Sequence, residues 1–121
     1  MRQLRLLPAR VVAYPDMVAL QLSWLDGLGK GYVSNYQVHA GHSPESMRPV
    51  VADWKHNRIR LPVGQFLDGH QYYFSIWSEH PDGDGITVSN TIAKRVHHSP
   101  ETSLEKIQEK RNKLFGQNDL F

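Results

Sequence analysis

The chain has 121 residues, of which 40% are hydrophobic, a size and composition that suit one domain with one core. Its 14 basic and 12 acidic residues are scattered and give a net charge of +2, whereas nucleic-acid binding is typical of clustered basic residues, so no nucleic-acid partner is expected. The absence of cysteine excludes disulfides, thiol catalysis and cysteine-based zinc sites. No segment approaches the ~18 apolar residues of a membrane span.

The N-terminal segment has early arginines, but Pro8 and Arg10 interrupt the apolar stretch that a secretory signal requires. No signal peptide is therefore visible. We expect a protein that is made and assembled in the cytoplasm, or an extracellular one whose leader has been removed.

Strand signals recur at regular intervals with turns between them, which is the pattern of an all-β protein. Alternation is clearest where Leu20, Leu22 and Trp24 are separated by Gln21 and Ser23, which predicts a strand with its apolar side chains facing the core. The predicted strands, in chain order, lie within residues 4–14 and at residues 18–24, 36–39, 49–54, 58–61, 72–78 and 87–96.

The stretch from Phe66 to Asn90 is the most specific part of the sequence. Phe66 is followed by a turn that ends in Gly69, and Tyr72 then begins an apolar alternation, which predicts a strand that enters a sheet at a corner. A Gly/Asp-rich turn and a second strand come next. This stretch resembles the F–G hairpin of a fibronectin type III domain, in the version common in bacterial proteins.

The resemblance covers about residues 8–96. It rests on residues that stand at the family's signature positions: Trp24, Tyr36-Gln37-Val38, Tyr72 at the tyrosine-corner position, and Ser89-Asn90. Phe66 stands where the family usually has Leu, and it keeps the apolar role. The resemblance implies a seven-stranded, immunoglobulin-like β-sandwich that binds, spaces or connects rather than catalyses.

The C-terminal segment shows helix signals. Ser99-Pro100-Glu101 offers a capping hydroxyl, a proline for the first helical position and an acid in the first turn. Four apolar residues then lie roughly on one face of the predicted helix: Leu104, Ile107, Leu114 and Phe115. We therefore divide the chain into a sandwich at residues 1–97 and a C-terminal amphipathic helix and tail at residues 98–121. A helix of this length is marginal alone, so it needs a docking surface or is a solvated tail.

Metal and catalytic sites are not expected. His39 and His42 have H-x-x-H spacing, but residues three apart on a strand point to opposite faces, and no acid or cysteine completes a zinc set. The Asp82–Gly85 turn lacks the loop length and terminal Glu of an EF-hand. No nucleophile elbow or phosphate loop is present. The sequence thus predicts no cofactor and no enzymatic activity.

An aromatic sheet face is the other candidate site. If the core-facing residues alternate as predicted, Tyr73 and Trp77 point outward beside His39, and Trp54 of a neighbouring strand could join them. Such a cluster suits a protein anchor or stacking on a sugar. It is also typical of aromatic residues that are simply good strand formers and cross-strand partners.

Two functions remain open. The first is a non-catalytic structural or protein-interaction module of a larger bacterial or phage assembly, such as a virion tail, a surface appendage or a secretion apparatus. Its partners would be protein subunits, including copies of itself. The alternative is an accessory carbohydrate-binding module that uses the aromatic face on a polysaccharide, as the family's occurrence beside polysaccharide-degrading enzymes implies.

Overall fold

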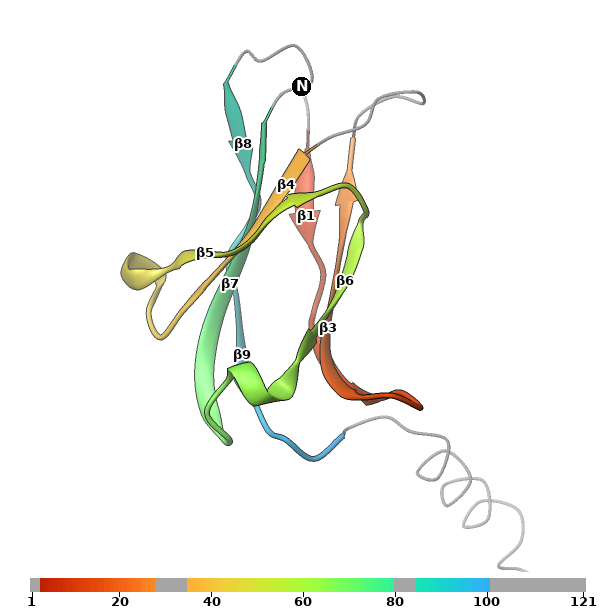
Figure 1. Ribbon diagram of the computed structural model, residues 1–121. Helices are drawn as coiled ribbons and strands as arrows, with labels where there is room; N and C mark the ends of the chain where they lie inside the picture. Colours follow the sequence, from red (N-terminus) through yellow and green to blue (C-terminus); the bar gives the residue numbers. More distant parts are fainter. Residues whose placement is uncertain (1–2, 28–34, 80–84, 101–121) are drawn as a thin grey trace, which may run out of the picture.

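The computed structural model describes residues 3–27, 35–79 and 85–100, and within them the chain forms two β-sheets that pack face to face (Figure 1). The strands are β1 (Leu4–Leu6), β2 (Arg10–Ala13), β3 (Val18–Asp26), β4 (Asn35–Gly41), β5 (Arg48–Trp54), β6 (Arg58–Pro62), β7 (His70–Glu79), β8 (Ile86–Val88) and β9 (Ile92–Val96). Two short 3-10 helices, η1 (Pro44–Ser46) and η2 (Val63–Gln65), lie in the connections. No α-helix occurs in these three ranges, so the all-β prediction is confirmed for them.

The first sheet is centred on β3. Strand β6 pairs with one side of β3, and β1 and β2 pair one after the other with its other side, all antiparallel. The single strand predicted within residues 4–14 is thus divided in two. The interruption contains Pro8, which has no N–H to offer a neighbouring strand.

The second sheet runs in the order β5-β4-β7, with β8 and β9 along the far side of β7. The predicted strand at residues 87–96 is therefore also divided, at Ser89-Asn90. The Ser89 hydroxyl accepts a hydrogen bond of 2.8 Å from the Ile76 N–H, and the Ser89 N–H donates one of 2.8 Å to the Ile76 carbonyl. The serine side chain thus takes the place of a backbone group in the ladder.

The two sheets are tied together along one side by Asn90. Its side-chain oxygen accepts a hydrogen bond of 2.8 Å from the Leu6 N–H, and its amide nitrogen donates one of 3.1 Å to the Leu6 carbonyl. One side chain therefore satisfies both backbone groups of a buried residue on β1.

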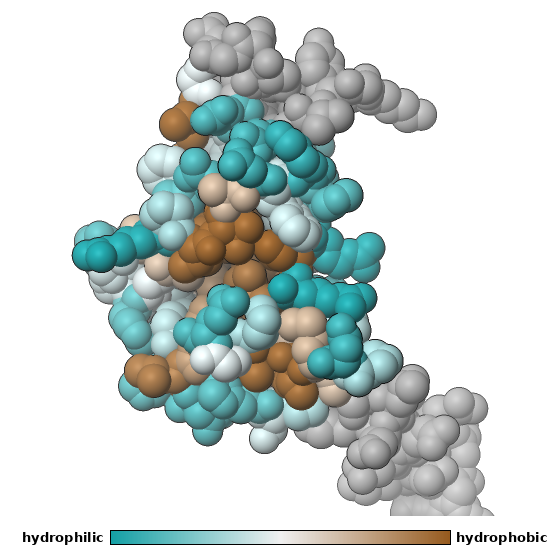
Figure 2. All heavy atoms as spheres, in the orientation of Figure 1, coloured by the Kyte–Doolittle hydropathy of each residue, from teal (hydrophilic) through white to brown (hydrophobic). Residues whose placement is uncertain are grey.

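The core lies between the sheets and follows the predicted alternation. Leu20, Leu22 and Trp24 of β3 are buried, with Trp24 only 2% exposed, and they face Tyr36 and Phe74 of the second sheet. The Trp24 and Tyr36 rings meet edge to face, with their centroids 5.3 Å apart. Figure 2 shows hydrophobic side chains gathered between the sheets and hydrophilic ones around them.

The predicted tyrosine corner is confirmed. Tyr72 is buried, and its hydroxyl accepts a hydrogen bond of 2.8 Å from the Leu67 N–H, in the loop that joins β6 to β7. Gly69 in the same loop has a φ of +77°, which glycine adopts without strain. Phe66, at the family's leucine position, is buried against the Tyr72 ring.

The predicted helix and its residues Leu104, Ile107, Leu114 and Phe115 lie outside the described residues. The described chain ends beside the tyrosine corner, where the His98 N–H donates to Asp68 and the His98 ring bonds the Phe66 carbonyl. In the described ranges, no helix has the length and apolar character needed to cross a membrane.

Candidate functional site

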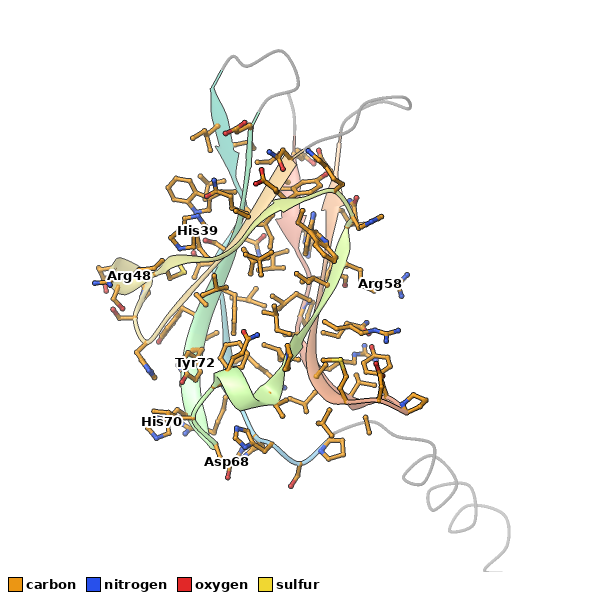
Figure 3. The ribbon with its side chains drawn as sticks, viewed as in Figure 1. His39, Arg48, Arg58, Asp68, His70 and Tyr72 are labelled. Atoms are coloured by element: carbon orange, nitrogen blue, oxygen red, sulfur yellow. The ribbon has the colours of Figure 1, made fainter. Side chains whose placement is uncertain are left out.

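His39 and Trp77 stack on the outer face of the second sheet. Their ring centroids are 4.4 Å apart and their planes differ by 8°. They come together because Gln37 pairs with Trp77 and His39 pairs with Ser75, so both aromatic side chains leave the same face of β4 and β7. Figure 3 shows His39 on this outer side.

Because they stack on each other, His39 and Trp77 are less exposed than two free outward-facing side chains would be. His39 is only 8% exposed, so it is a buried residue of the outer face rather than a free surface group. Its ring also hydrogen-bonds the Gln37 side chain at 3.0 Å, and burial lowers the pKa of His39 below its usual 6.5. Trp77 is half-buried, since His39 covers one side of its ring, and its indole N–H donates to Ser75 at 3.3 Å.

An apolar surface adjoins this stack at the edge of the sheet. Val88 lies directly opposite Trp77, and Ile86 lies opposite Glu79, so both project from the same face as Trp77. Ile86 is 59% exposed and Val88 is 48% exposed. We call Trp77, Ile86 and Val88 the β7–β8 patch.

Tyr73 lies on the same face of β7 but does not join the patch. It is four residues from Trp77, which corresponds to about 13 Å along a strand. Its hydroxyl accepts a hydrogen bond of 3.0 Å from Gln71, and it is half-buried. Tyr73 and Trp77 therefore both point outward, as predicted, but their rings do not form one cluster.

Trp54 lies elsewhere than predicted. It ends β5, opposite the core residue Tyr36, and the chain crosses from there to β6 in the first sheet. Its indole N–H donates to the Arg58 carbonyl at 3.1 Å, and its ring meets that of His56 edge to face at 5.4 Å. Trp54 therefore lies at the end of β5 next to β6 of the first sheet, and it does not lie on the face that carries Trp77.

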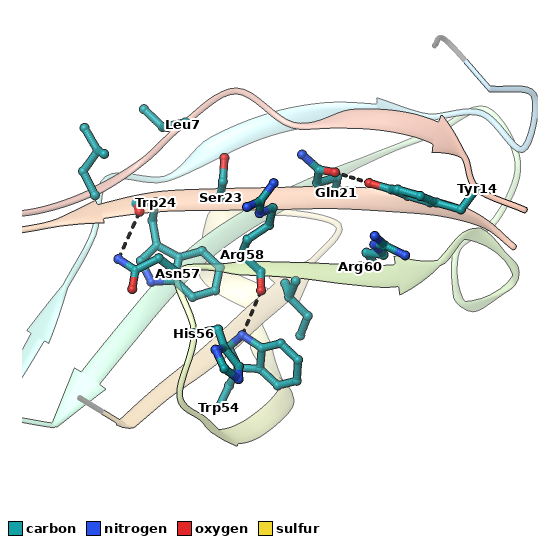
Figure 4. A pocket seen from close by; sticks show the side chains of 12 residues that line it. Leu7, Tyr14, Gln21, Ser23, Trp24, Trp54, His56, Asn57, Arg58 and Arg60 are labelled. Atoms are coloured by element: carbon teal, nitrogen blue, oxygen red, sulfur yellow. Dashed lines mark hydrogen bonds between the residues drawn. The ribbon is translucent and has the colours of Figure 1, made fainter. Parts of the chain in front are cut away.

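A groove of about 1030 Å³ opens on the first sheet beside Trp54 (Figure 4). We call it the arginine groove. The lining residues that matter for its chemistry are Tyr14, Gln21, Trp54, His56, Arg58 and Arg60. The Tyr14 hydroxyl hydrogen-bonds the Gln21 side chain, and the Arg60 guanidinium lies 3.7 Å above the centre of the Tyr14 ring. None of the described residues that line this groove is an Asp or a Glu.

The histidines that the structure describes do not assemble into a metal site. His42 packs on the Tyr72 ring at 4.3 Å and lies near His70, whereas His39 is held in its stack, so the H-x-x-H pair does not converge. No group of three potential metal ligands occurs among the residues that the structure describes.

Sequence reasoning missed the arginine groove and the apolar part of the β7–β8 patch. The groove is lined by residues from β3, β6, the segment before β3 and the end of β5. The alternation of polar and apolar residues within one strand cannot show that these separate segments lie together. The available signal was the alternation of Arg58 and Arg60 with buried Ile59 and Leu61. For the patch, the signal was Ile86 and Val88 at two-residue spacing in a short strand.

Comparison with solved structures identifies the fold. An Fn3-like protein from Clostridium thermocellum is similar over 71% of this chain and 84% of its own, with a TM-score of 0.52 and 13% identity. The chain is thus an Fn3-like, two-sheet β-sandwich, in agreement with the resemblance seen in the sequence. No protein-family model matches the sequence, and neither does any curated protein.

Two similar structures are larger enzymes. The pectate lyase PelI from Erwinia chrysanthemi, in complex with tetragalacturonic acid, is similar over 76% of this chain, with a TM-score of 0.56 and 16% identity. A beta-1,2-glucanase from Parabacteroides distasonis is similar over 84%, with a TM-score of 0.59 and 15% identity. This chain spans only 28% and 13% of those two chains, so the likeness is one of fold in one part of each enzyme.

Proposed function

We propose that this protein is a non-catalytic module that docks a protein subunit of a larger bacterial or phage assembly, such as a virion tail, a surface appendage or a secretion apparatus. The observation that carries the proposal is the β7–β8 patch, where two large aliphatic side chains are about half exposed beside a partly covered tryptophan. Exposed apolar side chains that gather at one place on a soluble domain are typical of protein-docking surfaces.

The position of the patch suggests how a partner binds. In the described residues, β8 pairs with β7 on one side and lies at the end of its sheet. Such an edge strand offers backbone N–H and C=O groups to a further strand. A partner segment that adds to β8 would gain backbone hydrogen bonds and cover Ile86 and Val88, as in β-strand addition.

A photo-crosslinking amino acid at position 88 tests this proposal in the cells that make the protein. We expect a discrete adduct with one protein subunit, identified by mass spectrometry, and we expect Ile86→Lys to remove it. The control places the same probe at the exposed position 71, at the far end of β7. Equal adducts from positions 71 and 88, or none from position 88, would count against docking at this edge.

The proposal also includes the number of strands and a C-terminal helix. We infer a seven-stranded fibronectin type III sandwich followed by an amphipathic helix within residues 98–121, whose apolar face adds a second contact to the assembly. The acidic and basic residues of this C-terminal segment nearly balance in number, which suits binding in a protein groove better than binding to a membrane surface. Deleting residues 101–121 should weaken assembly and leave the thermal stability of the sandwich unchanged.

An accessory polysaccharide-binding module is the second candidate. It is favoured by the likeness of fold to parts of a pectate lyase and a beta-1,2-glucanase. The face around Trp77 offers a sugar only one side of the indole ring, because His39 occupies the other, and the apolar Ile86 and Val88 beside it offer no hydrogen-bonding side chain to sugar hydroxyls. A surface that combines aromatic rings with hydrogen-bonding side chains would suit a saccharide better.

A further inference from the structure

The arginine groove joins aromatic rings, hydrogen-bonding side chains and positive charge on the outer face of the first sheet. On that face, Arg10 lies opposite Gln21, and Gln21 lies opposite Arg60, so two arginines flank one amide across three strands. Arg58 lies opposite Ser23 in the next outward row, roughly 6.6 Å along β6 from Arg60. All three arginines are exposed.

The positive charge of this face is not neutralised within the described residues. Arg58 and Arg60 form no ion pair there, and the groove between them has no acidic lining residue. Arg60 is instead held against the Tyr14 ring, which stabilises a cation without cancelling its charge. The groove therefore favours an anionic ligand.

Contacts with neighbouring residues orient the aromatic rings of the groove. The hydrogen bond from the Trp54 indole to the Arg58 carbonyl sets the orientation of the ring, and His56 supports it edge to face. Tyr14 is similarly fixed by its bond to Gln21. A ring that is oriented before a ligand arrives loses little conformational entropy on binding, which suits Trp54 to stack on another flat apolar surface.

The remaining groups favour a ligand with many hydroxyls. The Gln21 amide nitrogen makes no hydrogen bond among the described residues, and the Ser23 hydroxyl lies in the same groove. The groove volume of about 1030 Å³ lies at the upper end of the 300–1,000 Å³ that is roughly usual for a small-molecule pocket, and the groove is open to solvent. These features fit several units of a chain better than one small molecule.

We propose that the arginine groove binds an anionic polysaccharide, with Arg58 and Arg60 contacting carboxylates and Trp54 stacking on a sugar ring. Single-stranded nucleic acid combines the same chemistry, but its binding sites are usually more basic than a face with three arginines on a chain of net charge +2. The proposal rests on the second candidate function, to which it gives a site and a ligand class. It is independent of protein docking, because the β7–β8 patch lies on the other sheet.

Affinity electrophoresis of the full chain tests the proposal. The probes are alginate, carboxymethyl cellulose and hydroxyethyl cellulose; the last two share a glucan backbone and differ in charge. We expect retardation by at least one of the two anionic polymers and none by hydroxyethyl cellulose. Arg58→Gln/Arg60→Gln should weaken binding roughly tenfold or more, and added salt should weaken it in the native chain.

The control variant is Arg48→Gln/Arg95→Gln, which removes the same charge from exposed positions on the other sheet and should bind normally. Ile86→Lys should also bind normally, and its failure in assembly would then concern protein docking alone. Because Arg58 and Arg60 are exposed, their replacement removes no buried contact, and the loss of the Arg60–Tyr14 contact should lower the melting temperature only slightly. A variant that melts close to the native chain has therefore lost ligand contacts and not its fold.

Three results would overturn the proposal. They are the absence of retardation by both anionic polymers, equal loss in the two double-arginine variants, and tighter binding of single-stranded DNA than of either anionic polymer. The last would assign the groove to nucleic acid instead.

Discussion

Tyr72 and Tyr73 are adjacent residues with different roles. Tyr72 points into the core and its hydroxyl accepts a hydrogen bond from the Leu67 N–H, whereas the Tyr73 hydroxyl bonds Gln71 at the exposed surface. Both directions follow from the alternation of a strand, and the sequence was sufficient to predict them. Residues whose neighbours come from their own strand or hairpin are predictable in this way.

Replacing Tyr72 by Phe should lower the free energy of unfolding by about 1–2 kcal/mol, because the hydrogen bond between the Leu67 N–H and the buried tyrosine is lost. The change can be measured by urea denaturation. Tyr73→Phe is the matched control and should change stability by less than about 0.5 kcal/mol, since water can replace its bond. A loss below ~0.3 kcal/mol for Tyr72→Phe would contradict the corner assignment.

His39 should make stability depend on pH. Burial lowers its pKa in the folded protein, so below its unfolded pKa of about 6.5 the unfolded chain binds more protons than the folded chain. Stability is then full above this value and falls as the pH drops through it, until the folded His39 is itself protonated.

The measurement is the melting temperature between pH 8 and pH 5, compared in the native chain and in His39→Phe. The phenylalanine keeps an aromatic ring against Trp77 and does not titrate, so its profile should be flatter. His70→Gln, at an exposed position, should keep the native profile. Identical profiles for the native chain and His39→Phe would show that burial does not affect this histidine.

At the scale of elements, the divided edge strands show how the two sheets are joined. The strand alternation predicted where β1, β2, β8 and β9 lie, but not that each pair is interrupted. The first interruption contains Pro8, whereas the second contains Ser89 and Asn90, which bond residues distant in the sequence. Asn90 is the clearest case, since its amide serves the backbone of Leu6, 84 residues away in the sequence. No local pattern could reveal this.

Asn90→Ala should therefore lower the free energy of unfolding by about 1–3 kcal/mol, because both backbone groups of Leu6 lose their partner. Asn90→Asp tests the direction of the bonds, since a carboxylate can accept from the Leu6 N–H but cannot donate to its carbonyl. Thr91→Ala, at an exposed neighbouring position, is the control. If Asn90→Ala were as stable as this control, the bridge between the sheets would have no energetic role.

Trp54 and the arginines illustrate the same limit for the candidate sites. Trp54 was expected beside Trp77, but its chain segment leaves one sheet for the other, and its indole bonds the carbonyl of Arg58. The sequence could indicate that Arg58 and Arg60 face outward. It could not indicate that Arg10 lies in the same row, because that row is set by the pairing of three strands.

At the scale of the whole molecule, the two sheets carry surfaces of different chemistry on their outer faces. The second sheet has an apolar edge patch of Trp77, Ile86 and Val88, and the first has the arginine groove. The side chains between the sheets are buried and form the core, as expected for an Fn3-like sandwich. The two surfaces do not overlap, so the two proposed partners would not compete for one site.

Amide hydrogen exchange at residues 86–88 tests the central claim, docking of a protein strand at the β8 edge, most directly. In a paired strand, alternate residues direct their N–H groups to opposite sides, so at least one amide of β8 faces away from β7. This amide should exchange fast in the isolated protein and slowly in the native assembly, and Ile86→Lys should abolish the difference. Unchanged exchange at residues 86–88 in an assembly that protects other parts of the chain would contradict docking at this edge.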